Sequence, residues 1–287
     1  PACLPCYLRQ VQSVLEVAGA DEETAYQVFA QVLPMLGALD REKTPAENST
    51  LVLLRAYAAL GQGDPFRAAR AASNRQAWEW LARCERRATK AKDPLLFALK
   101  VAAAGNIVDL GILKDFDLGA SVAEVEAAAF ARPDYDALKY YLEKAKQVLV
   151  VGDNSGEIVL DRLLLRTLGR EGRRVLYAVK AGPVLNDATR QDAAEARLGE
   201  LAEVIDTGSN YLGVVEGHYS REFGQAMAES GLVIAKGQAN YETLEGTLFA
   251  GTKTFFLLRA KCAVIAAHLG VPPMAAVLVQ NRPRQGG

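Results

Sequence analysis

The chain has 287 residues, of which 50% are hydrophobic, and its 33 basic and 34 acidic residues give a formal net charge of −1. This length allows one large domain or two smaller ones with a sizeable core, and dispersed basic residues argue against a nucleic-acid partner. No run of 18 apolar residues predicts a membrane span, and no secretory signal pattern opens the chain. Four cysteines and two histidines favour neither a disulfide framework nor a histidine-based metal site, so a cytoplasmic protein is the simplest interpretation.

The first half of the chain has helical periodicity almost throughout. Three predicted helices begin with the same signal, an N-cap residue followed by proline: Thr44-Pro45, Asp64-Pro65 and Asp93-Pro94. The predicted helices span residues 5–17, 22–39, 45–60, 65–91, 94–104, 121–130 and 135–145. We therefore expect residues 1–145 to form an all-helical cap subdomain.

The pattern changes after residue 146, where short apolar runs alternate with helical stretches. The predicted strands span residues 147–151, 174–179, 202–206, 231–235, 254–258 and 275–280. Alternation of this kind is typical of an α/β fold with a mainly parallel sheet and helices on both faces. Residues 146–287 are therefore expected to form a Rossmann-like catalytic core.

Polar residues gather where the predicted strands end. The first strand stops at Gly152-Asp153-Asn154 and a helical pattern follows at once. Later strands are followed by Lys180, Asn186 and Asp187; by Asp206, Ser209 and Asn210; by Lys236, Gln238, Asn240 and Glu242; and by Arg259 and Lys261. Asp and Asn often only cap helices, but the carboxyl ends of parallel strands share one edge, where ligands bind. The repetition favours a functional site at this edge.

The turn after the first strand indicates both a metal and a phosphate. Asp153 and Asn154 offer the hard oxygen ligands that Mg²⁺ and Mn²⁺ prefer. The N–H groups at Ser155 to Glu157 begin a predicted helix, and helix N-termini attract anions. A site that binds a divalent ion and a phosphate group is the expected result.

Four motifs occur in a fixed order along the chain. They are Gly105-Asn106-Ile107-Val108-Asp109, Gly152-Asp153-Asn154-Ser155-Gly156-Glu157, Lys180-Ala181-Gly182-Pro183 with Asn186-Asp187-Ala188-Thr189, and Lys236-Gly237-Gln238-Ala239-Asn240-Tyr241-Glu242. With Cys3-Leu4-Pro5-Cys6 before them, the chain resembles the damage-control phosphatase family, formerly the domain of unknown function 89 family. The branch it resembles is the compact prokaryotic one that carries the paired cysteines.

The resemblance implies metal-dependent hydrolysis of phosphate monoesters of small metabolites, such as sugar phosphates or damaged and phosphorylated cofactor-like compounds. By motif, the metal ligands would be Asp153, Asn154 and Asp187, and Lys236 would contact phosphate. The expected ion is Mn²⁺ or Mg²⁺, with Ni²⁺ or Co²⁺ as further options. One departure from the family pattern is visible, because Ala181 separates Lys180 from Gly182-Pro183.

The expected catalytic residues are Asp153, Asp187, Lys236, Glu157 and Glu242, and the expected substrate-binding residues are Asn106, Asp109, Ser155, Gly156, Asn186, Gly237 and Asn240. For the nucleophile we prefer water activated at the metal by a carboxylate, with direct attack by an aspartate as the alternative. The base is Glu157, Asp187 or Glu242. Asn106 and Asp109 either form part of a lid over the cleft or only end a helix.

Three further questions stay open at this point. Cys3 and Cys6 form a single CxxC, which fits structural thiols, a redox pair or half of a metal site. The fold also permits a Rossmann-like methyltransferase, although no glycine-rich cofactor turn follows the first strand. A non-catalytic protein that binds phosphorylated metabolites is the third function class.

Overall fold

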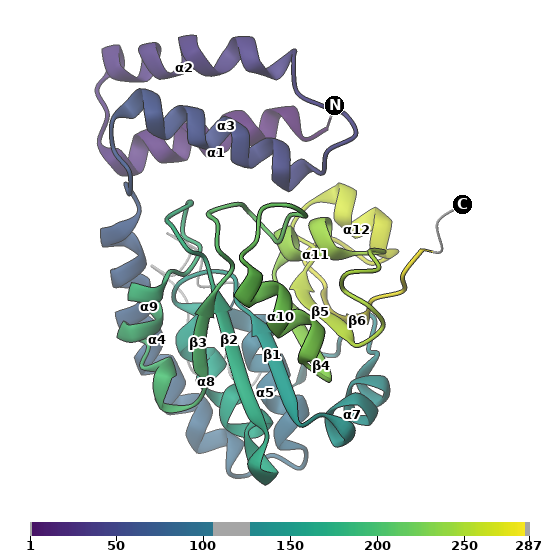
Figure 1. Ribbon diagram of the computed structural model, residues 1–287. Helices are drawn as coiled ribbons and strands as arrows, with labels where there is room; N and C mark the ends of the chain where they lie inside the picture. Colours follow the sequence, from purple (N-terminus) through teal and green to yellow (C-terminus); the bar gives the residue numbers. More distant parts are fainter. Residues whose placement is uncertain (1, 106–126, 285–287) are drawn as a thin grey trace.

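A computed structural model describes residues 2–105 and 127–284 (Figure 1). Its helices are α1 (Leu4–Ala18), α2 (Glu22–Leu36), α3 (Pro45–Leu60), α4 (Arg67–Ala88), α5 (Pro94–Ala104), α7 (Tyr135–Lys144), α8 (Glu157–Leu168), α9 (Arg190–Glu195), α10 (Arg221–Glu229), α11 (Gln238–Leu244) and α12 (Ala263–Leu269). Its strands are β1 (Gln147–Val151), β2 (Arg174–Val179), β3 (Glu203–Asp206), β4 (Leu232–Lys236), β5 (Thr254–Arg259) and β6 (Ala276–Gln280). Every predicted strand is confirmed to within one residue at each end.

The described strands form one six-stranded sheet with the order β3-β2-β1-β4-β5-β6. All neighbours are parallel except β6, which runs antiparallel to β5. The strand order changes direction at β1, which lies between β2 and β4. Val151 pairs with Ala178 on one side and with Ala235 on the other, so these three strands end at the same level. Ligands in open α/β sheets bind at such a switch point.

Side chains of each strand alternate between two cores, one on each face of the sheet. Val148 and Val150 pack with α4, α5 and α8, whereas Leu149 and Val151 pack with α10, α11 and α12. Burial on both faces explains why the strands read as continuous apolar runs. The predicted fold class, an α/β protein with a Rossmann-like, mainly parallel sheet, is confirmed.

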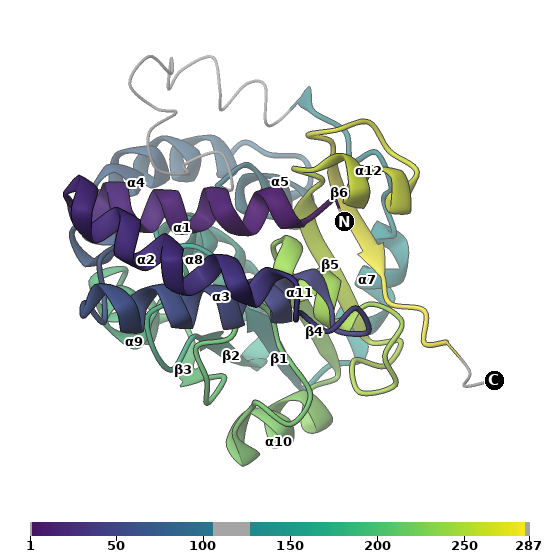
Figure 2. The same ribbon diagram turned by 90° about the horizontal axis from the view of Figure 1, so that it is seen from above.

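The N-terminal helices divide into two groups. Helices α4 and α5 share a buried core with α8 and the strands, because their apolar faces cover one side of the sheet. Helices α1, α2 and α3 pack mainly on one another and stand over the carboxyl edge of the sheet (Figures 1 and 2). Among the helices of residues 2–105 and 127–284, these three alone have the placement of a cap. The division into units 1–145 and 146–287 stays a prediction.

The helix-start signals are confirmed at two of the three predicted places. Thr44 forms a capping box with Glu47, and Asp93 caps α5. Helix α4 instead begins at Arg67, and the carboxylate of Asp64 binds the guanidinium of Arg70 at 2.8 Å. Within the described ranges, no helix is both long and apolar enough to span a membrane. The predicted helix 121–130 falls mostly outside those ranges, as do Asn106 and Asp109.

Candidate active site at the carboxyl edge of the sheet

The turn between β1 and α8 is held in place by two glycines. Gly156, the N-cap residue of α8, has φ 79°, a conformation that glycine adopts without strain. Gly237, with φ 81°, follows β4 and lies against Asp153, so a Cβ at Gly237 would be 2.0 Å from Asp153 Oδ2. This approach explains the Lys-Gly pair at the end of β4, because any side chain there would displace the carboxylate of Asp153.

Backbone hydrogen bonds join this turn to the loop that follows β2. Asn154 and Asp187 form an isolated antiparallel bridge. The N–H of Ser155 donates to the carbonyl of Asn186 at 2.9 Å, and the N–H of Ala188 donates to that of Asp153 at 2.8 Å. The structure thus brings together Asp153, Asn154 and Asp187, the three residues expected to bind a metal.

The carboxylates of this cluster are buried and close enough to repel one another. Burial raises the pKa of Asp153 well above its ordinary value, and the charges of Glu157 and Asp187 raise it further, against a smaller opposing effect of Lys261 and Lys236. The side-chain amide of Asn154 donates to Asp153 Oδ2 at 2.9 Å and to Glu157 Oε1 at 2.8 Å. A cation at this point would stabilise the ionised carboxylates.

A buried ionic network lies next to these carboxylates. The ammonium of Lys236, 1% exposed, donates to Asp161 at 2.7 and 2.8 Å and to Glu157 at 3.1 Å. Burial alone would lower the pKa of Lys236, but the charges of Asp161 and Glu157 outweigh burial and raise it. Tyr177 donates its hydroxyl to Asp161 at 2.6 Å. The predicted phosphate contact, Lys236, therefore binds two carboxylates in this structure.

Lys180 also reaches the cluster despite the inserted Ala181. Its ammonium donates to the carbonyl of Gly213 at 2.6 Å and lies 3.7 Å from Asp187 Oδ2. Burial lowers its pKa, whereas the carboxylates of Asp187 and Asp153 act in the opposite direction. Lys180 was not among the expected site residues, although its position at the end of β2 was a usable signal.

The predicted substrate-binding residues lie at the same edge, but not all are free to act. The N–H of Ser155 donates to the carbonyl of Asn186, and the N–H of Gly156 donates to Asn74 Oδ1 at 2.7 Å. Asn240 donates to the carbonyls of Gly152 and Lys236 and so ties the ends of β1 and β4 together. The buried Ser155 Oγ and Asn240 Oδ1 have no hydrogen-bond partner among the described residues.

Glu242 lies on α11, where this helix contacts α3 of the N-terminal helices. Its carboxylate accepts a hydrogen bond from Gln238 at 2.8 Å, and burial raises its pKa. Its charge in turn raises the pKa values of Cys3 and Tyr7 on α1. The role of Glu242 as the base stays a prediction.

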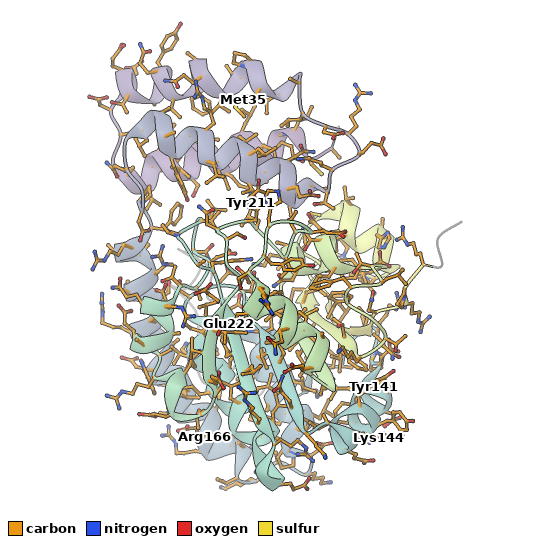
Figure 3. All side chains as sticks on the ribbon, viewed as in Figure 1. Met35, Tyr141, Lys144, Arg166, Tyr211 and Glu222 are labelled. Atoms are coloured by element: carbon orange, nitrogen blue, oxygen red, sulfur yellow. The ribbon has the colours of Figure 1, made fainter. Side chains whose placement is uncertain are left out.

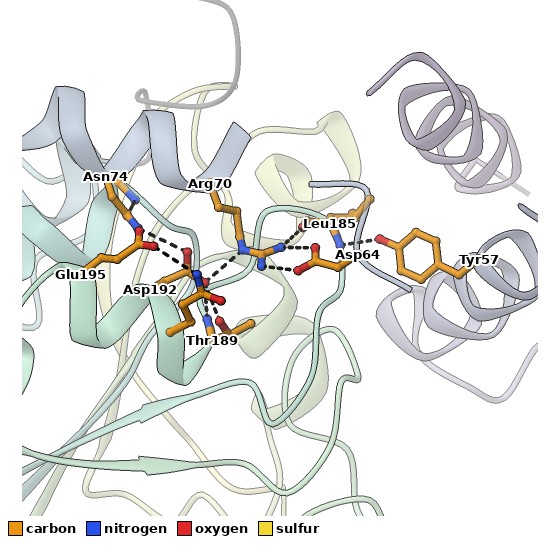
Figure 4. Close-up of polar contacts among 10 residues, drawn as sticks. Tyr57, Asp64, Arg70, Asn74, Leu185, Thr189, Asp192 and Glu195 are labelled. Atoms are coloured by element: carbon orange, nitrogen blue, oxygen red, sulfur yellow. Dashed lines mark hydrogen bonds and ion pairs between the residues drawn. The ribbon is translucent and has the colours of Figure 1, made fainter. Parts of the chain in front are cut away.

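Helix α4 contributes a polar network centred on Arg70 and Asp192, two residues that the sequence analysis did not single out (Figure 4). Arg70, 2% exposed, donates to Asp64 at 2.8 Å and to Asp192 at 3.0 Å. Asp192 also accepts hydrogen bonds from the N–H and hydroxyl of Thr189. The network fixes the segment that follows Asp187. Arg70 and Asn74 are four residues apart on one helix, a spacing that places both on one face.

The three N-terminal helices contact this edge through α3. Thr50 Oγ1 accepts a hydrogen bond from the N–H of Leu212 at 3.0 Å, and the hydroxyl of Tyr57 accepts one from the N–H of Leu185 at 2.8 Å. Tyr211 stacks on His218 with ring centroids 4.2 Å apart. Figure 3 shows Tyr211 between α3 and the sheet, so an aromatic side chain lies beside the loops that carry the site.

The donor set fits a divalent ion with oxygen ligands. It consists of two buried carboxylates and one amide, gathered by the bridge between Asn154 and Asp187, and such ligands suit Mg²⁺ or Mn²⁺. Among residues 2–105 and 127–284, no three His, Cys, Asp or Glu side chains form a preassembled metal cluster. The amide of Asn154 is therefore an essential part of the expected site.

Comparison with known proteins identifies the family of the chain. Residues 1–277 match the model of the damage-control phosphatase ARMT1-like domain. A damage-control phosphatase of Pyrococcus horikoshii is 32% identical over 283 residues, which cover 98% of this chain and 97% of the relative. One of Archaeoglobus fulgidus is 31% identical over 282 residues, or 94% and 95% of the two chains. The crystal structure of a DUF89 family protein from Pyrococcus horikoshii superposes with a TM-score of 0.90 at 31% identity and covers 98% of both chains. The chain belongs to the damage-control phosphatase family.

Proposed function

We propose that this phosphatase hydrolyses phosphate monoesters of small metabolites with a divalent ion, Mn²⁺ or Mg²⁺, held by Asp153, Asn154 and Asp187. The observation that carries the proposal is the bridge between Asn154 and Asp187, which places three oxygen donors at the switch point of the sheet. The relatives described as damage-control phosphatases span nearly the whole chain, which supports the same reaction. Sugar phosphates or damaged, phosphorylated cofactor-like compounds are the proposed substrates, and a cytoplasmic location belongs to the same proposal.

The ion, when bound, would supply the Lewis acidity that offsets charge on the phosphoryl oxygens. Lys180 and Lys236 provide fixed positive charge next to it, since both ammonium groups lie within 3.7 Å of site carboxylates. Lys236 would offset the negative charge of Glu157 and Asp161 and would add attraction for the phosphate dianion. The two ammonium groups would thus attract the charged phosphate group of the substrate but not the uncharged alcohol product.

Glu157 is the carboxylate best placed to accept a proton from the attacking water. It is the first residue of α8, 2% exposed, and its two oxygens accept hydrogen bonds from Asn154 and Lys236. These contacts fix its orientation beside Asp153, which is what general base catalysis requires. The two other candidate bases are placed differently. Asp187 is assigned to the metal site in this proposal, and Glu242 lies where α11 contacts the N-terminal helices.

Phosphate release from a panel of monoesters, with and without EDTA, tests the proposal. We expect activity that EDTA abolishes and that Mn²⁺ or Mg²⁺ restores, with Ni²⁺ and Co²⁺ as further ions to compare. For the site variant Asp153→Asn, the matched control is Asp206→Asn. Asp206 also ends a strand at this edge, but its carboxylate binds the exposed Arg190. Undiminished phosphate release from metal-stripped protein would contradict the metal-dependent mechanism, and no release from any ester would favour a binding protein.

A further inference from the structure

Three thiols lie outside the phosphatase site, where the start of α1 approaches α12. Cys3 is the N-cap residue of α1, and Cys6 follows one turn later, with its N–H donating to the carbonyl of Cys3 at 2.9 Å. Cys262 is the N-cap residue of α12. Figures 1 and 2 both show the start of α1 next to α12, so residues far apart in the sequence form one cluster.

The three sulfur atoms have different surroundings. Cys262 Sγ accepts hydrogen bonds from the N–H of Ile265 at 3.5 Å and from Gln238 at 3.6 Å, so it caps its own helix. Cys6 Sγ accepts a hydrogen bond from the guanidinium of Arg9 at 3.1 Å. Cys3 makes no side-chain cap bond. Cys3 and Cys6 are therefore the pair whose sulfur atoms are not committed to a helix cap.

A cavity gives small molecules access to Cys3. It has a volume of about 470 Å³, and its lining includes Cys3, Tyr7, Arg41, Lys43 and Asn48. Asn48 is 6% exposed, and its Oδ1 has no hydrogen-bond partner within the described ranges. Two cationic side chains and a buried amide oxygen suit a small anionic molecule that also carries N–H donors, and a volume of this size is typical of ligand sites.

The electrostatic environment disfavours a charged, reduced Cys3. Burial raises the pKa of the Cys3 thiol, and the neighbouring Glu242, Cys6 and Cys262 raise it further. Cys3 therefore stays a neutral thiol when reduced, and the reduced pair gains no stabilisation from its thiolate form. Dithiol pairs whose thiolates are not stabilised form the more stable disulfides, and an environment of this kind therefore favours the oxidised pair.

We propose that Cys3 and Cys6 form a reversible dithiol–disulfide site that reacts with small anionic disulfides of the glutathione type entering this cavity. The minor thiolate form of Cys3 attacks one sulfur of the small disulfide, forms a mixed disulfide and releases one thiolate. The Cys6 thiolate then attacks Cys3 Sγ, forms the Cys3–Cys6 bond and releases the second thiolate. The pair loses two electrons and two protons, and the small disulfide becomes two thiols.

The geometry of the first helical turn permits this bond. Residues three apart on a helix have Cβ atoms about 5–6 Å apart, and a disulfide needs about 3.5–4.5 Å. A small shift at a helix start, where Cys3 is only the cap residue, closes that difference. A metal held by the thiols has less support, because the described His, Cys, Asp and Glu residues include no preassembled metal cluster.

Peptide mass analysis after incubation with glutathione disulfide tests the proposal independently of the phosphatase reaction. Cys3, Cys6 and Arg9 lie on one tryptic peptide, whereas Cys262 begins another after Lys261. We expect the peptide ending at Arg9 to lose two hydrogens and to retain no glutathione. A cross-link to the Cys262 peptide, lasting glutathione on the native pair, or thiols that stay fully reduced would each overturn the assignment.

Two variants separate the two steps. Cys6→Ser should hold glutathione stoichiometrically on Cys3, because the second attack is lost, and a variant that carries none would contradict the order of attack. Cys262→Ser is the matched control, since serine is a good N-cap residue, and it should form the Cys3–Cys6 disulfide at the native rate. A disulfide that fails to form in Cys262→Ser would show that Cys262 is a partner and would also overturn the proposal.

Discussion

Asp153 shows that a single residue of a proposed catalytic site can lower the stability of the folded protein. Its carboxylate is buried, is pressed against Gly237 and is repelled by Glu157 and Asp187. A buried carboxylate beside two others is unfavourable unless a cation compensates it. The presence of Asp153 is therefore best explained by cation binding. Its replacement should raise the stability of the metal-free protein while it removes the activity.

Asp153→Asn should stabilise the metal-free protein and abolish its activity. Removing one charge relieves the repulsion, so the melting temperature in EDTA should rise by a few degrees for about 1 kcal/mol. The stabilisation by Mn²⁺, about 2.7 kcal/mol for native protein at a hundredfold excess over Kd, should disappear. Thermal unfolding with and without Mn²⁺ measures both effects. An unchanged response to Mn²⁺ would remove Asp153 from the metal site.

Lys236→Met should destabilise the protein and also slow catalysis. It leaves Glu157 and Asp161 without their buried partner, an effect of about 3–5 kcal/mol, and kcat/KM should fall about tenfold to a thousandfold. Adding Asp161→Asn should recover part of the stability in urea unfolding but not the activity. If the double variant also regains kcat/KM, Lys236 acts only by neutralising Asp161, and the proposed attraction for phosphate is wrong.

Individual residues differ in how far the sequence predicts them. Asp153 and Asn154 come just after β1, and Asp187 lies in the loop after β2, so their shared edge follows from the strand order. Asp161 was missed, although it lies one helical turn after Glu157 on α8 and so on the same face. The partners of Lys236 depend on side-chain direction, which a one-dimensional pattern does not contain.

At the scale of elements, the site depends on how α4 holds the loop between β2 and α9. Arg70 and Asn74 reach Asp192, the N3 residue of the capping box of α9, and Asn74 also accepts a hydrogen bond from the N–H of Gly156. One helix thus contacts both segments that carry the metal ligands. The periodicity of the sequence predicted α4, but not that a charged residue of it would be buried.

Arg70→Met should weaken metal binding without touching a metal ligand. The change removes the guanidinium that joins Asp192 to Asp64, so the loop that carries Asp187 loses an anchor on α4. Supporting contacts of this kind are worth about tenfold to a hundredfold in metal affinity. Calorimetric titration with Mn²⁺ measures the change. Arg67→Met, at an exposed position one turn earlier on α4, should bind Mn²⁺ normally, and equal losses in both variants would contradict the anchoring role.

At the scale of the whole molecule, three helices cover the edge where the strands end. Helix α3 shares an apolar cluster with the loops after β2 and β3, through Val184 and Leu212. Its contacts reach the same loops that supply Asp187 and Tyr211. The helical character of this region followed from the sequence, but the sequence could not separate α1–α3, which cover the edge, from α4 and α5, which belong to the sheet core. Both groups have similar periodicity, and only long-range packing distinguishes them.

The double variant Thr50→Val and Tyr57→Phe should change substrate preference more than metal affinity. Each change keeps the shape but removes an acceptor for a backbone N–H, of Leu212 or Leu185, and a buried unsatisfied donor costs about 1–3 kcal/mol. The cap should then dock less firmly. The metal would contact only the phosphate, which all substrates share. Discrimination among substrates needs contacts to the alcohol portion. The ratio of kcat/KM values between a sugar phosphate and a small aryl phosphate should therefore shift while the Kd for Mn²⁺ stays constant. An unchanged ratio together with weakened Mn²⁺ binding would show that α3 supports the metal loops and does not select the substrate.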